Sequence, residues 1–472
     1  MHMVSAPKII LMTIDSLRAD HMSLYGYKRD TTPQLREQSR EFTRFVWAFS
    51  PCSYTLPSHA SMLTSRYPSF HELGFFNEPG KARVTWSIGN LLRPLGYDTA
   101  AFVSTTVLRR ESGLDVGFDY YDDSCPKHEL NRPELLWRRG GDTLDAALRW
   151  LEMKGEDKCF TWIHLMDIHG PYCPPPPFDS SFVGDNYWQA PRSLESVHDG
   201  DEGGIPAFQL LCAKRDASGD LIDYEHDWNY YVSQYDGSIR YVDEVIGQFV
   251  ERLKDRGYWY DTLLFITADH GEAMGENNVF FFHGLTVTLD TIRVPLLIKP
   301  PKDVKTWHEV VEPPCSTLDI VPTILEALGY DYHFLGVQGI SLWPQIISET
   351  SSPQRFIFSE TEGQCSLITG QYQHLSVKPE PADPEFPFAL PKSLRKERLI
   401  DYRASPVGEQ DISYEVRILE RLRTISQQFI PLAQLAHSRI RGMKQKAEDA
   451  LSTLSEDETA RLRERLARLG YI

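Results

Sequence analysis

Five short and almost uninterrupted apolar runs, separated by segments of helical periodicity, constrain the fold of this chain more than any other feature. The runs are KIILMTI (8–14), YDTAAFVS (97–104), CFTWIHL (159–165), TLLFITA (262–268) and RVPLLIK (293–299). Strands that read as continuous apolar runs are covered on both faces, as in parallel sheets flanked by helices. The alternation therefore predicts a doubly wound α/β domain with a mostly parallel central sheet.

The segments between these runs have the spacing of helices. We expect helices over 87–96, 143–155, 238–255 and 316–329. In the third of these, apolar side chains recur at steps of three and four, which predicts one buried face; they are Ile239, Val242, Ile246, Phe249 and Leu253.

The alternation is interrupted once and then ends. Residues 174–228 open with PPPPF and contain HDGDEGG, which predicts an inserted loop region that either shapes substrate access or is a solvated excursion. From about residue 350, short alternating runs predict a small antiparallel sheet, followed by a helical tail whose last helix lies between Ser455 and Gly470. We expect a catalytic domain over 1–348 and a C-terminal subdomain over 349–472.

The charge of the chain limits its partners. A formal net charge of −17 over 472 residues disfavours nonspecific binding to nucleic acids and to anionic membranes. The apolar run near the N-terminus reads as a strand and not as a signal peptide, and no run approaches the ~20 residues of a membrane helix. Seven cysteines without Cys-x-x-Cys spacing suggest a reduced, cytoplasmic setting. An anionic substrate would need a locally positive site, and a metal ion is the most compact way to provide one.

The stretch TLPSHASMLTSRYP places a hydroxyl next to a helix start. Proline is tolerated in the first turn of a helix, so a helix is expected to begin at Pro57, with Thr55 at its positive end. The Thr55 hydroxyl is then either a helix cap or a nucleophile.

Potential metal ligands follow the ends of the predicted strands. They are Asp15, Asp167, His169, Asp269, His270 and, a little further on, His283. Each alone reads as a loop residue or a helix cap. Because the carboxyl ends of parallel strands meet at one edge of a sheet, together they predict a shared cleft that includes Thr55.

Several motifs in unbroken order resemble the sulfatase family of the alkaline phosphatase superfamily. They are TIDSLRAD, TLPSHASMLTSRYP, HLMDIHGPY, YDGSIRYVDEVIG, TADHGE, RVPLLI and STLDIVPTILEALG. The resemblance spans residues 8 to 345 and implies the α/β fold of that superfamily. It also implies hydrolysis of a small-molecule anionic ester, which in this family is a sulfate ester, a phosphomonoester, a phosphodiester or a phosphonate ester.

The resemblance also assigns roles by position. It implies that Asp15, Asp269 and His270 hold a divalent metal ion, and that Thr55 is both a ligand and the nucleophile. It implies that His169 and His283 bind the transferred group or protonate the leaving group.

Neighbouring positions are candidates for substrate binding. They are Arg18, His59 and Asp167, for which local pairing is the alternative explanation. His164 lies beside a matched position in the same way.

Two departures from the family pattern bear on the chemistry. Sulfatases of the standard type have Cys-x-Pro-x-Arg, whose cysteine becomes formylglycine, whereas this chain has Thr55, Pro57 and His59 at those positions. A sulfothreonine lacks the carbonyl collapse that releases sulfate, but a phosphothreonine is hydrolysed by attack at phosphorus, which favours phosphate or phosphonate esters. Ser16 stands where a second aspartate is common, so manganese or zinc fits at least as well as calcium.

Some alternatives stay open at this point. We expect one divalent ion, and a second ion is conceivable on Asp167, His169 and His283. A true sulfatase, a phospho-group transferase and an inactive anion-binding or partner-binding member are the other functional readings. Homo-oligomerisation is also left open.

Overall fold

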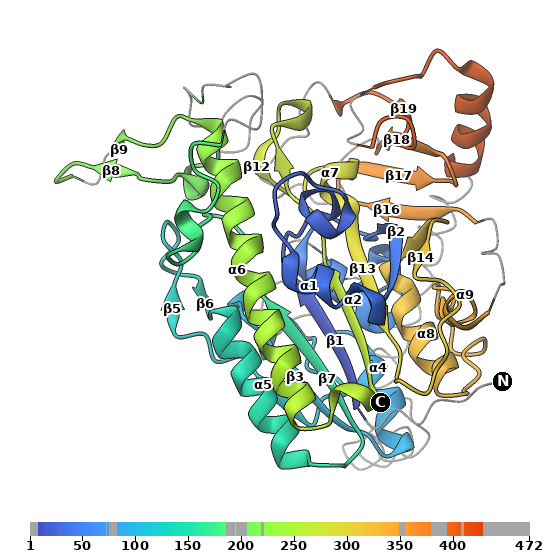
Figure 1. Cartoon of the computed structure of the whole chain (residues 1–472). Helices are drawn as coiled ribbons and strands as arrows, with labels where there is room; N and C mark the ends of the chain where they lie inside the picture. The colour runs from blue at the N-terminus through green and yellow to red at the C-terminus, as the bar shows by residue number, and fades with distance from the viewer. Residues whose placement is uncertain are drawn as a thin grey trace, which may run out of the picture.

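A mostly parallel sheet of nine strands forms the centre of the computed structural model, within the residues that the structure describes (Figure 1). Those residues are 8–71, 73–74, 83–185, 194, 205–218, 221–348, 355–378, 394–406 and 410–427. The strand order is β14-β2-β13-β10-β1-β7-β3-β4, with β15 paired to β2. The α/β fold class predicted from the sequence is confirmed.

All five predicted strands are present in this sheet. They are β1 (Lys8–Ile14), β3 (Asp98–Phe102), β7 (Cys159–Leu165), β10 (Thr262–Ala268) and β13 (Arg293–Lys299). Strand β13 runs antiparallel to both of its neighbours, β10 and β2. The remaining strands were not predicted: β2 (Thr43–Phe49), β4 (Tyr120–Asp122), β14 (Val310–Val311) and β15 (Cys315–Ser316).

The two longest helices of the described residues, α5 (Gly140–Lys154) and α6 (Trp228–Asp255), lie side by side over the sheet (Figure 1). Helix α6 begins at Trp228, well before the predicted start at residue 238. Asp227 caps it by accepting a hydrogen bond from the backbone N–H of Asn229 at 2.9 Å. The extra turns bury Tyr231 and Tyr235, whose rings extend the apolar face.

The other helices are short. They are α1 (Pro33–Glu37), α2 (Thr55–Thr64), α3 (Pro68–His71), α4 (Ile88–Leu92), α7 (Leu289–Ile292), α8 (Ile320–Ala327) and α9 (Trp343–Ile347). The predicted helix 87–96 is α4 followed by a 3₁₀ turn over Arg93–Leu95, where Pro94 cannot continue an α-helix. The predicted helix 316–329 is a 3₁₀ turn over Thr317–Asp319 followed by α8.

A second, four-stranded antiparallel sheet follows the main one in the chain. Its strands are β16 (Ile357–Glu360), β17 (Gln364–Ile368), β18 (Tyr372–Val377) and β19 (Arg398–Asp401), which appear in orange to red in Figure 1. All four lie in the region after about residue 350 where the sequence predicts a small antiparallel sheet. Ile368 and Leu375 pack with Trp47 and Phe49 of β2, so the small sheet shares apolar contacts with the main one.

The domain boundary at 348/349 stays a prediction, since residues 349–354 are not among those described. Residues 416–427 are helical, as expected for the start of the tail, and the helix expected between Ser455 and Gly470 lies outside the described residues.

Short hairpins lie near one end of the sheet. Within the predicted insertion, β8 (Lys214–Arg215) pairs with β9 (Leu221–Asp223) and projects from the body of the protein (Figure 1). Ahead of it in the chain, β5 (Lys127–His128) pairs with β6 (Leu136–Trp137). After β10, β11 (Ala273–Met274) pairs with β12 (Phe280–Phe282).

No helix in the described part of the chain is long and apolar enough to span a bilayer. The cytoplasmic setting remains a prediction.

The register of the three central strands determines where the functional side chains lie. In the parallel ladders, Ile14 of β1 pairs with Leu165 of β7 and with Ala268 of β10. The residues that follow these three positions therefore leave the sheet at the same level. Asp15 and Asp269 are two of them.

Candidate active site

Four predicted residues converge at this edge of the sheet. Asp15, Asp269 and His270 are fully buried, and Thr55 is 4% exposed. One ligand atom from each of Asp15, Asp269 and His270 lies within 4.8 Å of the other two. The structure thus brings together the whole predicted metal-binding set around one hydroxyl.

Thr55 is the first residue of α2 and lies inside the helix, not before it as predicted. The helix starts earlier because the carbonyl of Tyr54 already accepts the first intrahelical bond, from the N–H of Ser58 at 3.0 Å. Pro57 remains within the first turn, where a missing N–H is harmless. The Thr55 Oγ1 atom lies 3.2 Å from Nε2 of His270 and 3.4 Å from Oδ2 of Asp15.

The two carboxylates of the site experience different surroundings. Burial raises the pKa of Asp269 well above its usual value, and the neighbouring Asp15 raises it further. Burial acts in the same direction on Asp15, but the hydrogen bond from His164 and the nearby His169 and His270 lower its pKa well below the usual value. The pair therefore holds a single negative charge most easily unless a cation lies between the two carboxylates.

The tautomers of two histidines follow from their partners. Nδ1 of His270 donates to the carbonyl of Gly271 at 2.8 Å, which leaves a lone pair on Nε2, the atom that faces Thr55. Nδ1 of His164 accepts the N–H of Ser104 at 3.4 Å, so Nε2–H donates to Oδ2 of Asp15 at 3.3 Å. His164 thus orients Asp15, as residues behind a metal ligand commonly do.

The donor set fits a divalent cation. One oxygen of Asp269, Oδ2, is buried and has no hydrogen-bond partner among the described residues. It lies 3.4 Å from the free Nε2 of His270. Two buried carboxylates and a neutral imidazole suit manganese or zinc, and the oxygen ligands also suit calcium.

A fifth predicted residue reaches the site through the β11–β12 hairpin. Ala273 pairs with Phe282, which places Glu272 and His283 next to each other. Nδ1 of His283 lies 3.2 Å from Oε2 of Glu272, and the His283 ring centroid is 4.2 Å from that of His270. Burial lowers the pKa of His283 to about 4 and raises the pKa of Glu272 to about 8.

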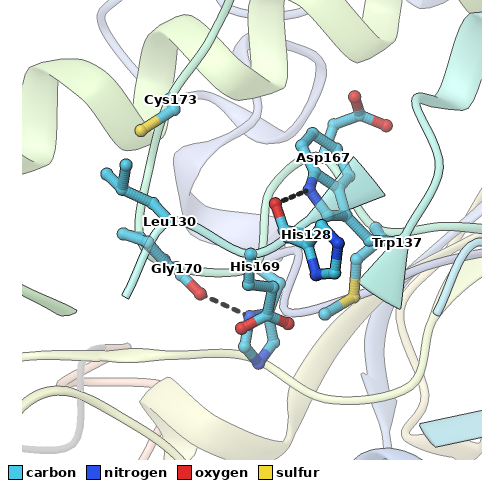
Figure 2. A pocket seen from close by; sticks show the side chains of 10 residues that line it. His128, Leu130, Trp137, Asp167, His169, Gly170 and Cys173 are labelled. Atoms are coloured by element: carbon cyan, nitrogen blue, oxygen red, sulfur yellow. Dashed lines mark hydrogen bonds between the residues drawn. The ribbon is translucent and has the colours of Figure 1, made fainter. Parts of the chain in front are cut away.

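His169 links the site to a pocket of about 180 Å³. Its Nδ1 donates to the carbonyl of Gly170 at 2.6 Å, so Nε2 is the atom left for a substrate (Figure 2). Its ring centroid is 5.2 Å from that of His283. The pocket is lined by His128, Glu129, Leu130, Trp137, Met166, Asp167, His169, Gly170, Pro171 and Cys173.

The structure gives the three predicted substrate-binding residues other partners. The Arg18 guanidinium bonds to Asp20, to Glu276 and to the carbonyl of Glu272, and is 1% exposed. Arg18 therefore forms a structural ion-pair network.

His59 is buried beneath Thr55. Its Nδ1 donates to the carbonyl of Thr55 at 2.8 Å, and its Nε2 accepts from the hydroxyl of Thr13 at 2.9 Å. Both ring nitrogens are thus occupied, and His59 supports helix α2 without facing a substrate.

Asp167 reaches the pocket wall, but its carboxylate turns towards α5. Oδ2 accepts the N–H of Gly140 at 2.7 Å, and Oδ1 lies 3.4 Å from Nη1 of Arg139. Asp167 therefore stabilises the N-terminus of α5 and does not face the pocket with its carboxylate.

The hypothesis of a second ion on Asp167, His169 and His283 receives no support from the geometry. Among the described residues, two groups of three ligand types converge, and this trio is neither of them. The second group is His59, His164 and Asp269, whose imidazole nitrogens are already bonded within the protein. One ion is the better fit.

Sequence reasoning missed Glu272 as a site residue. It stands two positions after His270 in TADHGE, so the motif itself was visible. Only the pairing of β11 with β12 shows that Glu272 contacts His283, and strands of two or three residues leave almost no trace in a sequence.

A buried hydroxyl beside carboxylates and imidazoles at the carboxyl edge of an α/β sheet is the arrangement expected of an active site. The family model described as Sulfatase matches residues 7–330. The chain belongs to the sulfatase family.

Several known proteins are similar to this chain. The ulvan-active sulfatase of Formosa agariphila is 24% identical over 341 residues, which cover 68% of this chain and 61% of that protein. The multifunctional alkaline phosphatase superfamily protein PehA of Trinickia caryophylli is 25% identical over 390 residues, covering 68% of this chain and 73% of PehA.

A solved phosphonate monoester hydrolase from Silicibacter pomeroyi superimposes with a TM-score of 0.67 at 20% identity, over 91% of this chain and 95% of that one. At this level of identity, the superposition establishes the fold.

Proposed function

We propose that this sulfatase-family hydrolase cleaves phosphate or phosphonate esters through a covalent ester on Thr55. The observation that carries the proposal is the position of the buried Thr55 hydroxyl, 3.2 Å from Nε2 of His270 and 3.4 Å from Oδ2 of Asp15. A threonine hydroxyl is a weak nucleophile unless a neighbouring base or cation activates it. This hydroxyl has acceptors for its proton within reach.

The proposed reaction has two displacements. Oγ1 of Thr55 attacks phosphorus while its proton passes to Oδ2 of Asp15, and the bond from phosphorus to the leaving oxygen breaks. His283 is the candidate to donate a proton to that oxygen from Nε2, because the buried carboxyl of Glu272, whose pKa is raised to about 8, can hold its own proton against Nδ1. His169, whose Nε2 carries a lone pair, can instead accept a proton from the attacking water. Water then attacks phosphorus, the bond to Thr55 breaks, and the threonine takes back a proton.

Asp15, Asp269 and His270 are the residues that would hold a divalent ion. When bound, such an ion supplies positive charge that offsets the two carboxylates and stabilises negative charge on the reacting group. The proposal of one ion rests on the unpartnered Oδ2 of Asp269 and on the lone pair of His270.

The identity of the nucleophile favours phosphorus over sulfur. Threonine has no aldehyde hydrate through which sulfate could leave, whereas a phosphothreonine is opened by attack at phosphorus. The similarity to PehA and to a phosphonate monoester hydrolase supports this direction. Matched 4-nitrophenyl sulfate, phosphate and phosphonate esters would separate the readings, and faster cleavage of the sulfate would overturn the preference.

The nucleophile is tested by Thr55→Ala. We expect kcat/KM to fall by at least roughly 10³-fold, since a variant without the nucleophile retains only binding and electrostatic effects. Activity on 4-nitrophenyl esters and mass spectrometry of the acid-quenched enzyme are the measurements. A phosphorylated peptide that contains residue 55 should appear in the wild type only.

A matched control comes from the same helix. Thr64 is equally buried, but its hydroxyl donates to the carbonyl of Ala60 at 2.6 Å, so Thr64→Ala should keep the activity. Full turnover by a folded Thr55→Ala variant would end the nucleophile proposal.

A further inference from the structure

The backbone adopts an uncommon conformation where strand β1 leads into the candidate active site. The N–H of Asp15 still bonds to the carbonyl of Leu165 at 2.9 Å, which continues the parallel pairing of β1 with β7. At the next residue, Ser16, φ is 60°, in the left-handed region that few residues other than glycine adopt. Such a conformation persists only where neighbouring groups hold it, and residues of this kind cluster at functional sites.

Ser16 bonds to one oxygen of each carboxylate in the site. Its hydroxyl donates to Oδ1 of Asp15 at 2.9 Å, and its backbone N–H donates to Oδ1 of Asp269 at 3.2 Å. The N–H of His270 donates to the same Oδ1 of Asp269 at 2.8 Å. Both Oδ1 atoms are thus occupied, and the Oδ2 atoms remain for Thr55 and for the proposed ion. The position of Ser16 therefore determines the orientation of both carboxylates.

One phenol from helix α6 holds the turn that follows Asp15. The hydroxyl of Tyr235 donates to the carbonyl of Ser16 at 2.7 Å and accepts the backbone N–H of Arg18 at 3.0 Å. Ser16, Arg18 and Tyr235 are all buried, so water does not compete for these two bonds. Loss of the hydroxyl would leave a buried carbonyl and a buried N–H of the turn without this partner.

We propose that Tyr235 is a positioning residue, which holds the left-handed turn at Ser16 and thereby orients the carboxylates of Asp15 and Asp269. The inference rests on the proposed function, in which these carboxylates hold the ion and Asp15 accepts the proton of Thr55. Residues that orient metal ligands typically change the affinity for the ion by about 10- to 100-fold when they are replaced.

The simpler explanation is that Tyr235 only fills the core. Its ring packs edge-on against the rings of Tyr172 and His21, at centroid distances of 5.3 Å and 5.2 Å. Tyr235→Phe keeps the ring and these contacts, and it removes only the hydroxyl. This variant therefore separates the two explanations.

The test measures the affinity of Tyr235→Phe for the ion. Mn²⁺, Zn²⁺ and Ca²⁺ are titrated separately into EDTA-treated protein by calorimetry. For the ion that the wild type binds most tightly, we expect the dissociation constant to rise by about 10- to 100-fold in the variant. Its melting temperature without metal establishes that it is folded.

Tyr231 provides the matched control, one turn earlier in the same helix. It is also fully buried, and its hydroxyl accepts the backbone N–H of Leu211 at 3.0 Å, away from the turn at Ser16. Tyr231→Phe should lower the melting temperature, because a buried hydrogen bond is lost, but it should keep the affinity for the ion. An unchanged affinity in Tyr235→Phe would overturn the positioning role and leave Tyr235 as a core residue.

The wild type separates this inference from the proposed function. If it binds none of the three ions, the proposed ion is wrong, and a crystal structure of Tyr235→Phe still tests the positioning role. A left-handed Ser16 with its bonds to Asp15 and Asp269 intact would refute that role. A changed turn with both carboxylates displaced would support it.

Discussion

Glu272 fixes the orientation of His283, which is the clearest case at this site of one side chain acting through another. The carboxylate is fully buried and lies 3.2 Å from Nδ1 of His283, so it determines which ring nitrogen faces the reacting group. Glu272 itself has no role in contact with substrate and is a positioning residue.

Replacement of this carboxylate tests that role. Glu272→Gln keeps the shape but weakens the hold on Nδ1, and we expect kcat to fall by about 10- to 100-fold. KM should change little, because the residue does not touch the substrate. Steady-state kinetics measure the split, and leaving groups of decreasing pKa should progressively rescue the variant if His283 protonates the leaving oxygen.

An unchanged kcat in Glu272→Gln would show that the contact with His283 has no part in turnover. Glu276→Gln is not a suitable control, since Glu276 pairs with Arg18. The exposed Glu134 provides a neutral comparison.

The positions of the proposed ligands could be predicted because their residue types and their places after strand ends coincide. Asp15, Asp269 and His270 follow apolar runs, and the runs alone predict where the sheet edge lies. Arg18 and His59 could not be assigned in this way. Their roles depend on which neighbour satisfies each polar atom, and that is a property of the tertiary packing.

At the level of single elements, α3 is attached to helix α2 through one histidine. Nε2 of His71 lies 2.9 Å from Oγ of Ser61 and 3.1 Å from the carbonyl of Pro57, both in α2. Nδ1 accepts the N–H of Leu73 at 3.1 Å, so the neutral ring satisfies every neighbour. A second proton would point at that N–H, which agrees with a pKa lowered to about 4 by burial.

This contact should make the stability difference between the wild type and His71→Gln depend on pH. Above about pH 6.5 the histidine is neutral in both the folded and the unfolded state, and its contribution is complete. As the pH falls towards 4, the unfolded chain binds the proton first, so the contribution is lost. By pH 5 the difference in the free energy of unfolding between the two proteins should shrink by about 1 to 2 kcal/mol. Urea unfolding at each pH measures this difference.

His333 gives the matched control, because its side chain is 78% exposed. His333→Gln should show no such narrowing. A constant difference between the wild type and His71→Gln from pH 7.5 to 5 would mean that His71 is not held neutral.

Helices and strands with a clear pattern of apolar residues were predicted well. Those in which polar and apolar residues are mixed were not. Strands β1, β7, β10 and β13 have the expected bounds because both of their faces are buried and apolar. Strand β2 was missed because the polar Thr43 and Arg44 leave only the short apolar run FVWAF. The early turns of α6 use tyrosines and polar residues, which weakens the periodic signal.

At the scale of the whole molecule, the proposed ion should stabilise the fold. An ion that binds the folded state alone adds about 2.7 kcal/mol to the free energy of unfolding at a concentration of 100 Kd. We expect the melting temperature of EDTA-treated protein to rise when Mn²⁺, Zn²⁺ or Ca²⁺ is added, with the preferred ion acting at the lowest concentration. Asp269→Asn should lose this shift.

The Asp269→Asn variant should remain folded without metal, because it removes one of two buried carboxylates that repel each other. Asp216 is exposed, so Asp216→Asn serves as the control that keeps the shift. An equal shift in Asp269→Asn and in the wild type would place the ion elsewhere.

The overall architecture was predictable because alternation of apolar runs and helices leaves few topologies. The antiparallel direction of β13 was not predictable, since an apolar run that is buried on both faces has the same pattern in a parallel and in an antiparallel strand. Two contacts beside the pocket could not be predicted: Glu129 with Arg132, and Gln209 with Gly170. They lie in short hairpins and irregular segments, whose sequences do not determine their conformation.

The alignment of Ile14 with Leu165 and Ala268 means that the proposed reaction centre does not exist in any contiguous stretch of the polypeptide. A nascent chain stays inert until β10 has been made and has docked beside β1. A slip of one position in either ladder would also turn the ligands away from each other. Activity therefore requires correct long-range pairing of the strands. A chain with mispaired strands would lack the assembled site and would be inactive.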